Sequence, residues 1–214
     1  VSCFNGNDGS VNTAVTGGTS PYTYSWNVGG INTADITGLK IGTYIHTVTD
    51  NAGCKASKAI TITQPALLTA VATGVDEACN YLDNGLVSVT PYGGTLPYKY
   101  VWQPTGDTTA VVTDLPAGTY SVTVTDSKGC TATASATVIE PQPLNIAFDD
   151  QRDVSCFNGS DGAVRAVPSG GTPNYTYLWS PGNSAGDAIF NITAGTYTVI
   201  ITDKNNCQAT DTVT

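Results

Sequence analysis

The chain has 214 residues, of which 12% are charged, and eight Lys and Arg against seventeen Asp and Glu give a net charge of −9. So few basic residues offer no positive face for phosphate, which argues against nucleic-acid binding. No apolar run is long enough for a membrane-spanning helix. The chain lacks Met and begins inside a repeat, so we expect it to be a piece of a longer protein.

One ten-residue stretch occurs three times and predicts how the chain is organised. It opens with two glycines and then places aromatic residues at every second position, at residues 17–26, 93–102 and 170–179. Alternating aromatics indicate a strand with one aromatic face. Such a face needs a second sheet to cover it, so each repeat predicts a small two-layer β domain. We favour core packing for these rings over an exposed platform for carbohydrate stacking.

The repeats predict three tandem domains, at residues 1–64, 65–140 and 141–214. The second and third begin with an apolar strand, at 67–73 and 144–148, which has no counterpart in the first. Gln64-Pro65 and Glu140-Pro141 mark the boundaries, where proline stiffens the chain. We therefore expect a stiff head-to-tail array.

Within each repeat, a polar, glycine-rich loop leads into an alternating strand, at residues 11–15, 87–91 and 164–168. Variable turns follow the aromatic strand. The repeats converge again on Gly-Thr-Tyr, at 42–44, 118–120 and 195–197, which opens a strand that ends in Thr-Asp. Residues 115–124 are similar to the tyrosine-corner strand of immunoglobulin-like and fibronectin-type sandwiches. With no helical period anywhere, the fold class is all-β, with antiparallel sandwiches.

The cysteines occupy the same frame in every repeat. The first Cys precedes the Trp of its repeat by 23 positions and the second follows it by 28. This repetition favours pairing within each repeat, as Cys3–Cys54, Cys79–Cys130 and Cys156–Cys207. Free buried thiols are the alternative, and zinc is disfavoured because there is no CxxC pair and a single histidine. Disulfides predict an oxidising, extracytoplasmic setting.

Acidic loops are the candidates for a metal site. The expected disulfides place two aspartates of one repeat near one end of the domain, Asp8 with Asp50 and Asp161 with Asp203. Oxygen-rich loops that are clamped together can hold calcium. The second repeat has Asn84 in place of the acid, and no specific calcium-loop pattern is present. Solvated turn residues are therefore the interpretation that we favour.

Nothing in the sequence marks an active site, so we expect no enzyme activity and no cofactor apart from calcium. His46 stands where the other repeats have Val122 and Val199, and we interpret it as a partly buried structural residue. Two short tripeptides that begin with Asp resemble the acceptor of surface O-glycosylation in Bacteroidota. Their acceptor residues are Thr108 and Thr212.

Four motifs recur in fixed order: Cys-Phe-Asn-Gly-x-Asp-Gly, Gly-Gly-Thr-x-Pro-Tyr-x-Tyr-x-Trp, Gly-Thr-Tyr-x-Val-x-Val-Thr-Asp and a closing Gly-Cys. Together they resemble the SprB-type repeat of very long cell-surface adhesins of Bacteroidota, over nearly the whole chain. The second repeat departs from the pattern at residues 80–82, and the third has Asn206 before Cys207. The resemblance implies an extracellular location on the cell surface and export by the type IX system, with some members carried along the cell in gliding motility.

The function that this resemblance implies is that of a stalk or filament segment, which spaces and presents an adhesive region. Its partners are then neighbouring repeats of the same chain and parallel copies of the filament. Surface glycans or abiotic surfaces are contacted by regions outside these residues. Two other classes stay open: a glycan-binding module, and accessory repeats of a large secreted enzyme.

Overall fold

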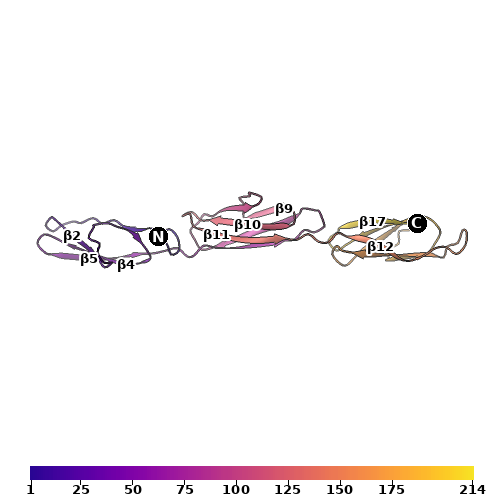
Figure 1. Cartoon of the computed structure of the whole chain (residues 1–214), viewed down its shortest axis with the longest axis horizontal. Helices are drawn as coiled ribbons and strands as arrows, with labels where there is room; N and C mark the ends of the chain where they lie inside the picture. The colour runs from indigo at the N-terminus through magenta and orange to yellow at the C-terminus, as the bar shows by residue number, and fades with distance from the viewer. The chain divides into compact units, whose positions relative to one another are not determined.

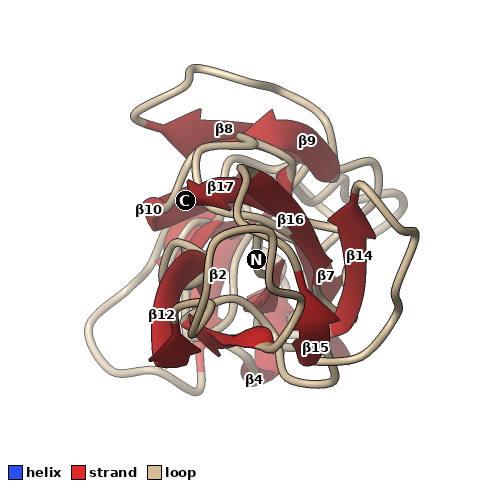
Figure 2. Ribbon diagram, turned by 90° about the vertical axis from the view of Figure 1, so that its right-hand side faces the viewer, coloured by secondary structure: helices blue, strands red, loops and turns tan.

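The computed structural model describes residues 1–214 and contains strands and turns without any helix (Figure 1; Figure 2). No helix suited to crossing a membrane is therefore present. The fold divides into two compact units. The first comprises Val1–Ala72, Val89–Ala110 and Ser121–Ser135, and the second comprises Thr73–Ser88, Val111–Tyr120 and Ala136–Thr214. Both units draw on the second repeat, and the domain boundaries given above stay a prediction.

The first repeat contains five strands: β1 (Gly9–Val11), β2 (Thr23–Trp26), β3 (Ile36–Leu39), β4 (Gly42–Thr49) and β5 (Lys55–Ile62). One sheet pairs β1 with β3, and the other has the order β2-β4-β5, with every pair antiparallel. Apolar side chains of both sheets meet in one core of Val11, Trp26, Ile36 and Leu39. This repeat is therefore a two-layer sandwich.

The second repeat contains six strands: β6 (Thr69–Val75), β7 (Gly85–Tyr92), β8 (Lys99–Gln103), β9 (Val111–Leu115), β10 (Gly118–Thr125) and β11 (Thr131–Val138). Their orders in the two sheets are β6-β7-β9 and β11-β10-β8. Trp102, Val122 and Val124 are buried in the first unit, and Val87 is buried in the second.

The third repeat also contains six strands: β12 (Asn145–Arg152), β13 (Gly162–Ser169), β14 (Thr176–Ser180), β15 (Ala188–Ile192), β16 (Tyr197–Thr202) and β17 (Gln208–Val213). The sheets have the orders β12-β13-β15 and β14-β16-β17. Val164 and Ile189 from one sheet and Trp179, Val199 and Ile201 from the other share a core. The antiparallel sandwiches confirm the predicted all-β fold class.

A tyrosine corner occurs in every repeat, as the Gly-Thr-Tyr motif predicts. Each tyrosine hydroxyl donates to the backbone carbonyl four residues earlier: Tyr44 to Lys40 at 3.0 Å, Tyr120 to Pro116 at 2.7 Å and Tyr197 to Thr193 at 3.0 Å. This hydrogen bond is characteristic of immunoglobulin-like sandwiches.

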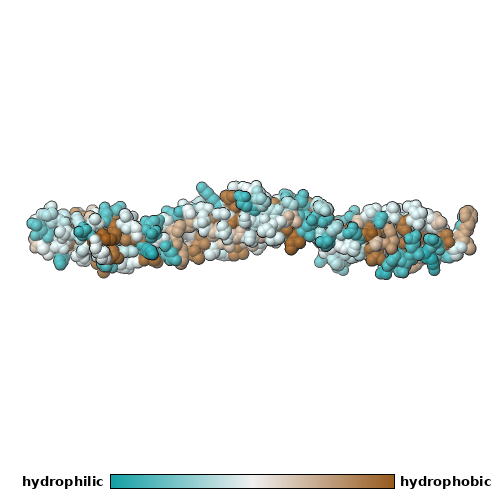
Figure 3. Space-filling model, viewed as in Figure 1, coloured by the Kyte–Doolittle hydropathy of each residue, from teal (hydrophilic) through white to brown (hydrophobic).

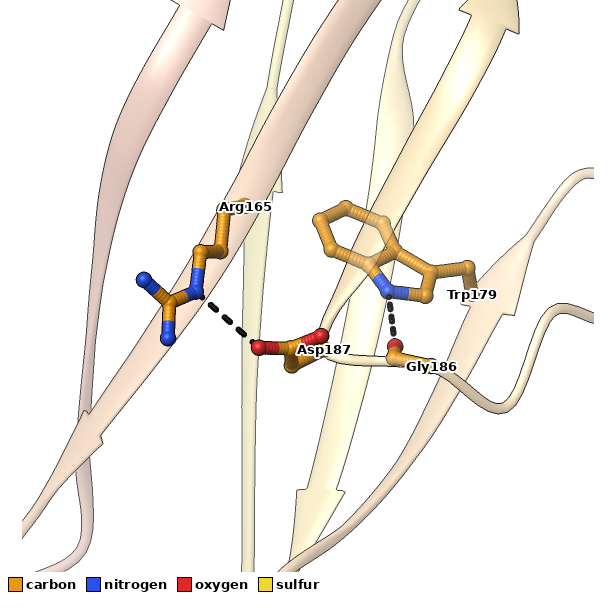
Figure 4. Close-up of polar contacts among 4 residues, drawn as sticks. All are labelled: Arg165, Trp179, Gly186 and Asp187. Carbon is orange, nitrogen blue, oxygen red and sulfur yellow. Dashed lines mark hydrogen bonds and ion pairs between the residues drawn. The ribbon is translucent and has the colours of Figure 1, made fainter.

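The three tryptophans are buried, which confirms their predicted place in the core. Each indole Nε1–H donates over 3.0 Å to the carbonyl seven residues later, which belongs to Thr33, Thr109 or Gly186. Figure 4 shows this bond from Trp179, together with an exposed ion pair between Arg165 and Asp187. The tyrosines that precede the tryptophans are half-buried.

The first repeat has no counterpart of β6 or β12, and its structure shows the consequence. Strand β1 has three residues, whereas β7 and β13 have eight. In the third repeat, β12 pairs with β13 from Asn145 opposite Ser169 to Asp149 opposite Arg165. The same edge of the first repeat is an open groove of about 570 Å³, lined by Val48 and Ile60 among others.

Candidate functional site

The structure contains two disulfides, and each joins two successive repeats. Cys3 bonds Cys130 within the first unit, and Cys79 bonds Cys207 within the second, with Cα–Cα distances of 5.7 and 5.6 Å. The first Cys of one repeat thus pairs with the second Cys of the next. The predicted pairs Cys3–Cys54, Cys79–Cys130 and Cys156–Cys207 are wrong, and Cys54 and Cys156 are free and exposed.

The length of a strand excludes pairing within the first repeat. The loop of Cys3 lies at the end of β5, where Asn5 N–H donates to Gln64 Oε1 at 3.0 Å. Cys54 stands at the other end, immediately before the first residue of β5. Eight residues of strand span about 26 Å at ~3.3 Å per residue. A disulfide needs Cα atoms about 5.5–6 Å apart.

The loop after each first Cys is closed by one side-chain oxygen. That oxygen accepts from the N–H of the residue before the Cys: Asp8 from Ser2, Asn84 from Ala78 and Asp161 from Ser155, each at 2.9 Å. The hydrogen bonds from Ser2 lower the pKa of Asp8, and those from Ser155 lower the pKa of Asp161. Asn84 provides the same acceptor without a charge. The acidic residues predicted as metal ligands therefore have a structural task.

The turn before each second Cys is built on an aspartate, four residues earlier. One carboxylate oxygen accepts from the cysteine N–H: in Asp50 from Cys54 at 2.8 Å, in Asp126 from Cys130 at 2.9 Å and in Asp203 from Cys207 at 2.9 Å. The other oxygen accepts from the threonine N–H of the Gly-Gly-Thr stretch: Thr19 at 3.0 Å, Thr95 at 2.8 Å and Thr172 at 2.7 Å. The carboxylate thus fastens the cysteine turn to that stretch.

These hydrogen bonds lower the pKa of Asp50 and Asp126, and the Asp126 carboxylate leaves no room for a side chain at Gly94. The hydrogen bond from Thr19, followed by that from Cys54, lowers the pKa of Asp50. Burial opposes ionisation of Asp126, but its backbone hydrogen bonds outweigh burial and lower the pKa. Gly94 has φ +62°, and a Cβ there would lie 2.9 Å from the Asp126 carboxylate. Asp126 was missed as a site residue, although Thr-Asp ends this strand in every repeat.

The predicted calcium ligands do not converge. Asp8 belongs to the first-Cys loop and Asp50 to the second-Cys turn, which lie at opposite ends of β5. The expectation that they share one end rested on the wrong cysteine pairing. No group of three or more His, Cys, Asp or Glu side chains is arranged to hold a metal ion. Calcium binding and O-glycosylation of the exposed Thr108 and Thr212 stay predictions.

His46 lies in the core of the first repeat. Its ring stacks on Trp26 with the centroids 4.3 Å apart, and on Tyr24 at 5.6 Å. Its Nε2 is buried without a hydrogen-bond partner. Burial lowers the pKa of His46, although the negative charge of Asp35 opposes this effect. The residue is thus a neutral part of the core.

Each joint between repeats contains hydrogen bonds besides its disulfide, and the first also has a small apolar cavity lined by Phe4, Leu67 and Leu68. In the first unit, Cys130 Sγ lies 3.5 Å from the carbonyl of Ser2. In the second, Asn205 Nδ2 donates to the carbonyl of Ala78 at 3.1 Å, and Cys207 Sγ lies 3.2 Å from the same oxygen. On the face drawn in Figure 3, hydrophobic residues lie scattered among hydrophilic ones. Each joint thus has one disulfide as its covalent cross-link.

Solved structures with some likeness to the chain are immunoglobulin domains. The N-terminal eight Ig domains of Down Syndrome Cell Adhesion Molecule match at a TM-score of 0.38 and 14% identity, over 97% of this chain and 33% of that one. The chain thus spans a third of that relative. The amphioxus IgVJ-C2 molecule matches with a TM-score of 0.32 and 17% identity, over 64% of this chain and 98% of that one. Extracellular domains 3–5 of Drosophila OTK match with a TM-score of 0.27 and 11% identity, over 97% of this chain and 91% of that one. The strand orders and the tyrosine corners described above identify the repeats as immunoglobulin-like sandwiches.

Among protein families, the SprB repeat matches the chain in three places. The matched residues are 1–30, 71–107 and 149–184, a little under half of the chain. Each match contains the first Cys and the Trp of one repeat. A search of curated proteins finds no match. The chain therefore carries the SprB repeat three times over, in tandem immunoglobulin-like β-sandwiches.

Proposed function

We propose that the chain is a segment of the stalk of a large secreted cell-surface adhesin, exported by the type IX system. It would space and present an adhesive region for surface attachment or gliding motility. The SprB matches support a repeat segment of a cell-surface adhesin, and the disulfides support an extracellular setting. The mechanical role in this proposal is supported by the observation that each disulfide joins two successive repeats.

A joint with a disulfide is held twice, once by the backbone and once by the bond. In the first joint, the backbone runs from Cys54 to Cys79 while the Cys3–Cys130 bond connects the same two repeats. If pulling straightens the backbone of the joint, the bond still limits how far the repeats separate. A stalk that must transmit tension without lengthening needs this property.

The shortest covalent path between Cys3 and Cys207 uses both disulfides. It crosses from Cys3 to Cys130, follows the chain back to Cys79 and crosses to Cys207. This path contains about 51 residues, and at ~3.5 Å per residue it extends to about 180 Å. With both bonds reduced, about 204 residues extend to about 700 Å.

Single-molecule pulling from the two termini tests the mechanical proposal. We expect the oxidised chain to reach the short limit and the reduced chain to reach the long one. A variant with Ser in place of both free cysteines, Cys54 and Cys156, is the matched control and should behave as the oxidised chain does. Equal final lengths with and without reductant would overturn the proposal.

Glycan binding receives less support than the stalk role. A glycan-stacking platform on the repeated aromatic stretch would need its rings exposed to solvent. Trp26, Trp102 and Trp179 are buried, with their N–H groups bonded to backbone carbonyls. The stalk is therefore the function that we propose.

A further inference from the structure

We propose that each joint between repeats is assembled by hydrogen bonds before its disulfide forms, so that the folded, reduced chain is the substrate of the thiol oxidation that closes the joint. Gln64 and Glu140 are then positioning residues, which help to hold the first Cys of one repeat beside the second Cys of the next. This order of assembly depends on the contacts within the joints and not on the adhesin role.

One contact connects the loop of the first Cys to the boundary before the following repeat. In the first joint, the N–H of Asn5 donates to Gln64 Oε1 at 3.0 Å. In the second joint, the N–H of Tyr81 donates to Glu140 Oε1 at 2.7 Å. Asn5 and Tyr81 each stand two residues after a first Cys, and Gln64 and Glu140 each precede the boundary proline. The boundary side chain therefore fixes the first-Cys loop in the same way in both joints.

A second contact connects the boundary to the Gly-Gly pair of the following repeat. The carbonyl of Ala66 accepts from the N–H of Gly94 at 3.0 Å. In the second joint, the carbonyl of Gln142 accepts from the N–H of Gly171 at 2.8 Å. In both joints the acceptor lies two residues after the positioning residue. The boundary is thus bonded to both of the repeats that it connects.

The aspartate of the second-Cys turn completes the connection. In the first joint, Asp126 accepts from Thr95, which is next to Gly94, and from the N–H of Cys130. Asp203 has the same two partners in the second joint. Hydrogen bonds and short backbone segments therefore connect the two cysteines of a joint without the disulfide. All the residues of each joint belong to a single compact unit.

Oxidation before folding would favour the wrong bonds. The two cysteines of one repeat are 51 positions apart, whereas the bonded cysteines are 127 and 128 apart. Because closure of an unfolded loop becomes rarer with the 3/2 power of its length, a pair within a repeat should close about fourfold more readily. In the folded chain, β5 holds Cys54 about 26 Å from the loop of Cys3. Folding therefore has to precede oxidation for the native pairs to form.

Oxidised glutathione is a sufficient electron acceptor for closing a joint. The four cysteines of the joints are half-buried, so a small oxidant can reach them. One cysteine thiolate attacks a glutathione sulfur, which forms a mixed disulfide and releases one glutathione thiolate. The other thiolate then attacks the cysteine sulfur of the mixed disulfide and releases the second glutathione thiolate. Two protein thiols are oxidised to one disulfide, and one glutathione disulfide is reduced to two thiols.

Oxidising the reduced chain in its folded and unfolded states tests the order. The chain is placed in a glutathione redox buffer with or without urea, alkylated at early times and digested with trypsin. We expect the folded chain to give only the Cys3–Cys130 and Cys79–Cys207 pairs. The unfolded chain should give each within-repeat pair in about fourfold excess over either of these. The same mixture of pairs from both states would overturn the proposal.

Two single variants test the positioning residues, and each joint is the control for the other. Q64A removes the acceptor of Asn5, so it should slow closure of Cys3–Cys130 about fivefold, the effect of one hydrogen bond, and leave the second joint unchanged. E140A should slow only the second joint. Both side chains are half-buried and outside the cores, so the sandwiches should stay folded. Closure rates that neither variant changes would overturn the proposal.

A matched pair of glycine variants tests the contact between the boundary and the Gly-Gly pair. Gly93 and Gly17 have φ values of +72° and +79°, so alanine strains the backbone at both. A Cβ on Gly93 would overlap the Leu67 carbonyl oxygen, whereas a Cβ on Gly17 would have no atom within 4 Å. We expect G93A to close Cys3–Cys130 more slowly than G17A does, and equal rates would overturn the proposal. The pulling experiment starts from the oxidised chain, so its result is independent.

Discussion

Replacing His46 by valine is expected to stabilise the first repeat. The side chain is 5% exposed, its Nε2 has no hydrogen-bond partner, and the other repeats bury Val122 and Val199 at this position. An unsatisfied buried polar atom costs about 1–3 kcal/mol. The ring stacking on Trp26 that would be lost contributes about 0.5–1.5 kcal/mol. The difference predicts a gain of about 1 kcal/mol at neutral pH.

Acid should enlarge the advantage of H46V. Burial lowers the pKa of His46 in the folded chain, so the unfolded chain, with an ordinary pKa of 6.5, takes up a proton first. The contribution of the neutral ring to stability is complete above pH 6.5. It is lost as the pH falls from 6.5 through the lower folded value. Valine cannot titrate, so H46V should not show this loss.

Peptide-resolved hydrogen exchange measures this effect within one repeat. About 1 kcal/mol should slow exchange in β4 about fivefold at neutral pH, and by more at pH 5 after correction for intrinsic rates. Strand β10 in the same digest is the control, and its exchange should not change. Faster exchange in β4, or the same pH dependence in H46V as in the unmodified chain, would refute the reasoning.

Three other changes test the fold. Adding residues 141–153, which include β12, before Val1 should supply the missing strand and fill the open groove. Calorimetry should then show a higher melting temperature for the first repeat. An unchanged melting profile would contradict the interpretation that the groove is the place of this strand. D126A leaves three backbone N–H groups without their acceptor, so its urea midpoint should fall, while the isosteric D126N should fall less. Y120F removes the bond to the Pro116 carbonyl and should cost about 1 kcal/mol in urea unfolding; no loss would argue against the tyrosine corner.

The strands and the core were predictable because local patterns determine them. Alternation from Tyr22 to Trp26 places the indole on the covered face, and the Gly-Thr-Tyr motif places Tyr44 four residues after its acceptor. Each of these two patterns depends only on residues a few positions apart. Because both occur in all three repeats, they are not chance occurrences.

The cysteine pairing was not predictable from spacing. A frame copied with a fixed period allows pairing within a repeat and pairing between successive repeats equally well. The structure differs from the prediction because β5 separates Cys54 from the loop of Cys3. Strand β5 begins directly after Cys54 and carries the chain away from that cysteine. The expectation that Asp8 and Asp50 lie at one end of the domain was wrong for the same reason, since they follow their cysteines to opposite ends of β5.

The pairing of successive repeats is the central claim, and a peptide map without reductant tests it most directly. Each Cys lies in its own tryptic peptide, so every pairing gives a distinct set of masses. After the free thiols of the oxidised monomer are alkylated, the account predicts two cross-linked pairs, residues 1–40 with 129–152 and 59–99 with 205–214, and alkylated peptides 41–55 and 153–165. Cross-links within repeats, joining 1–40 to 41–55, 59–99 to 129–152 and 153–165 to 205–214, would contradict it.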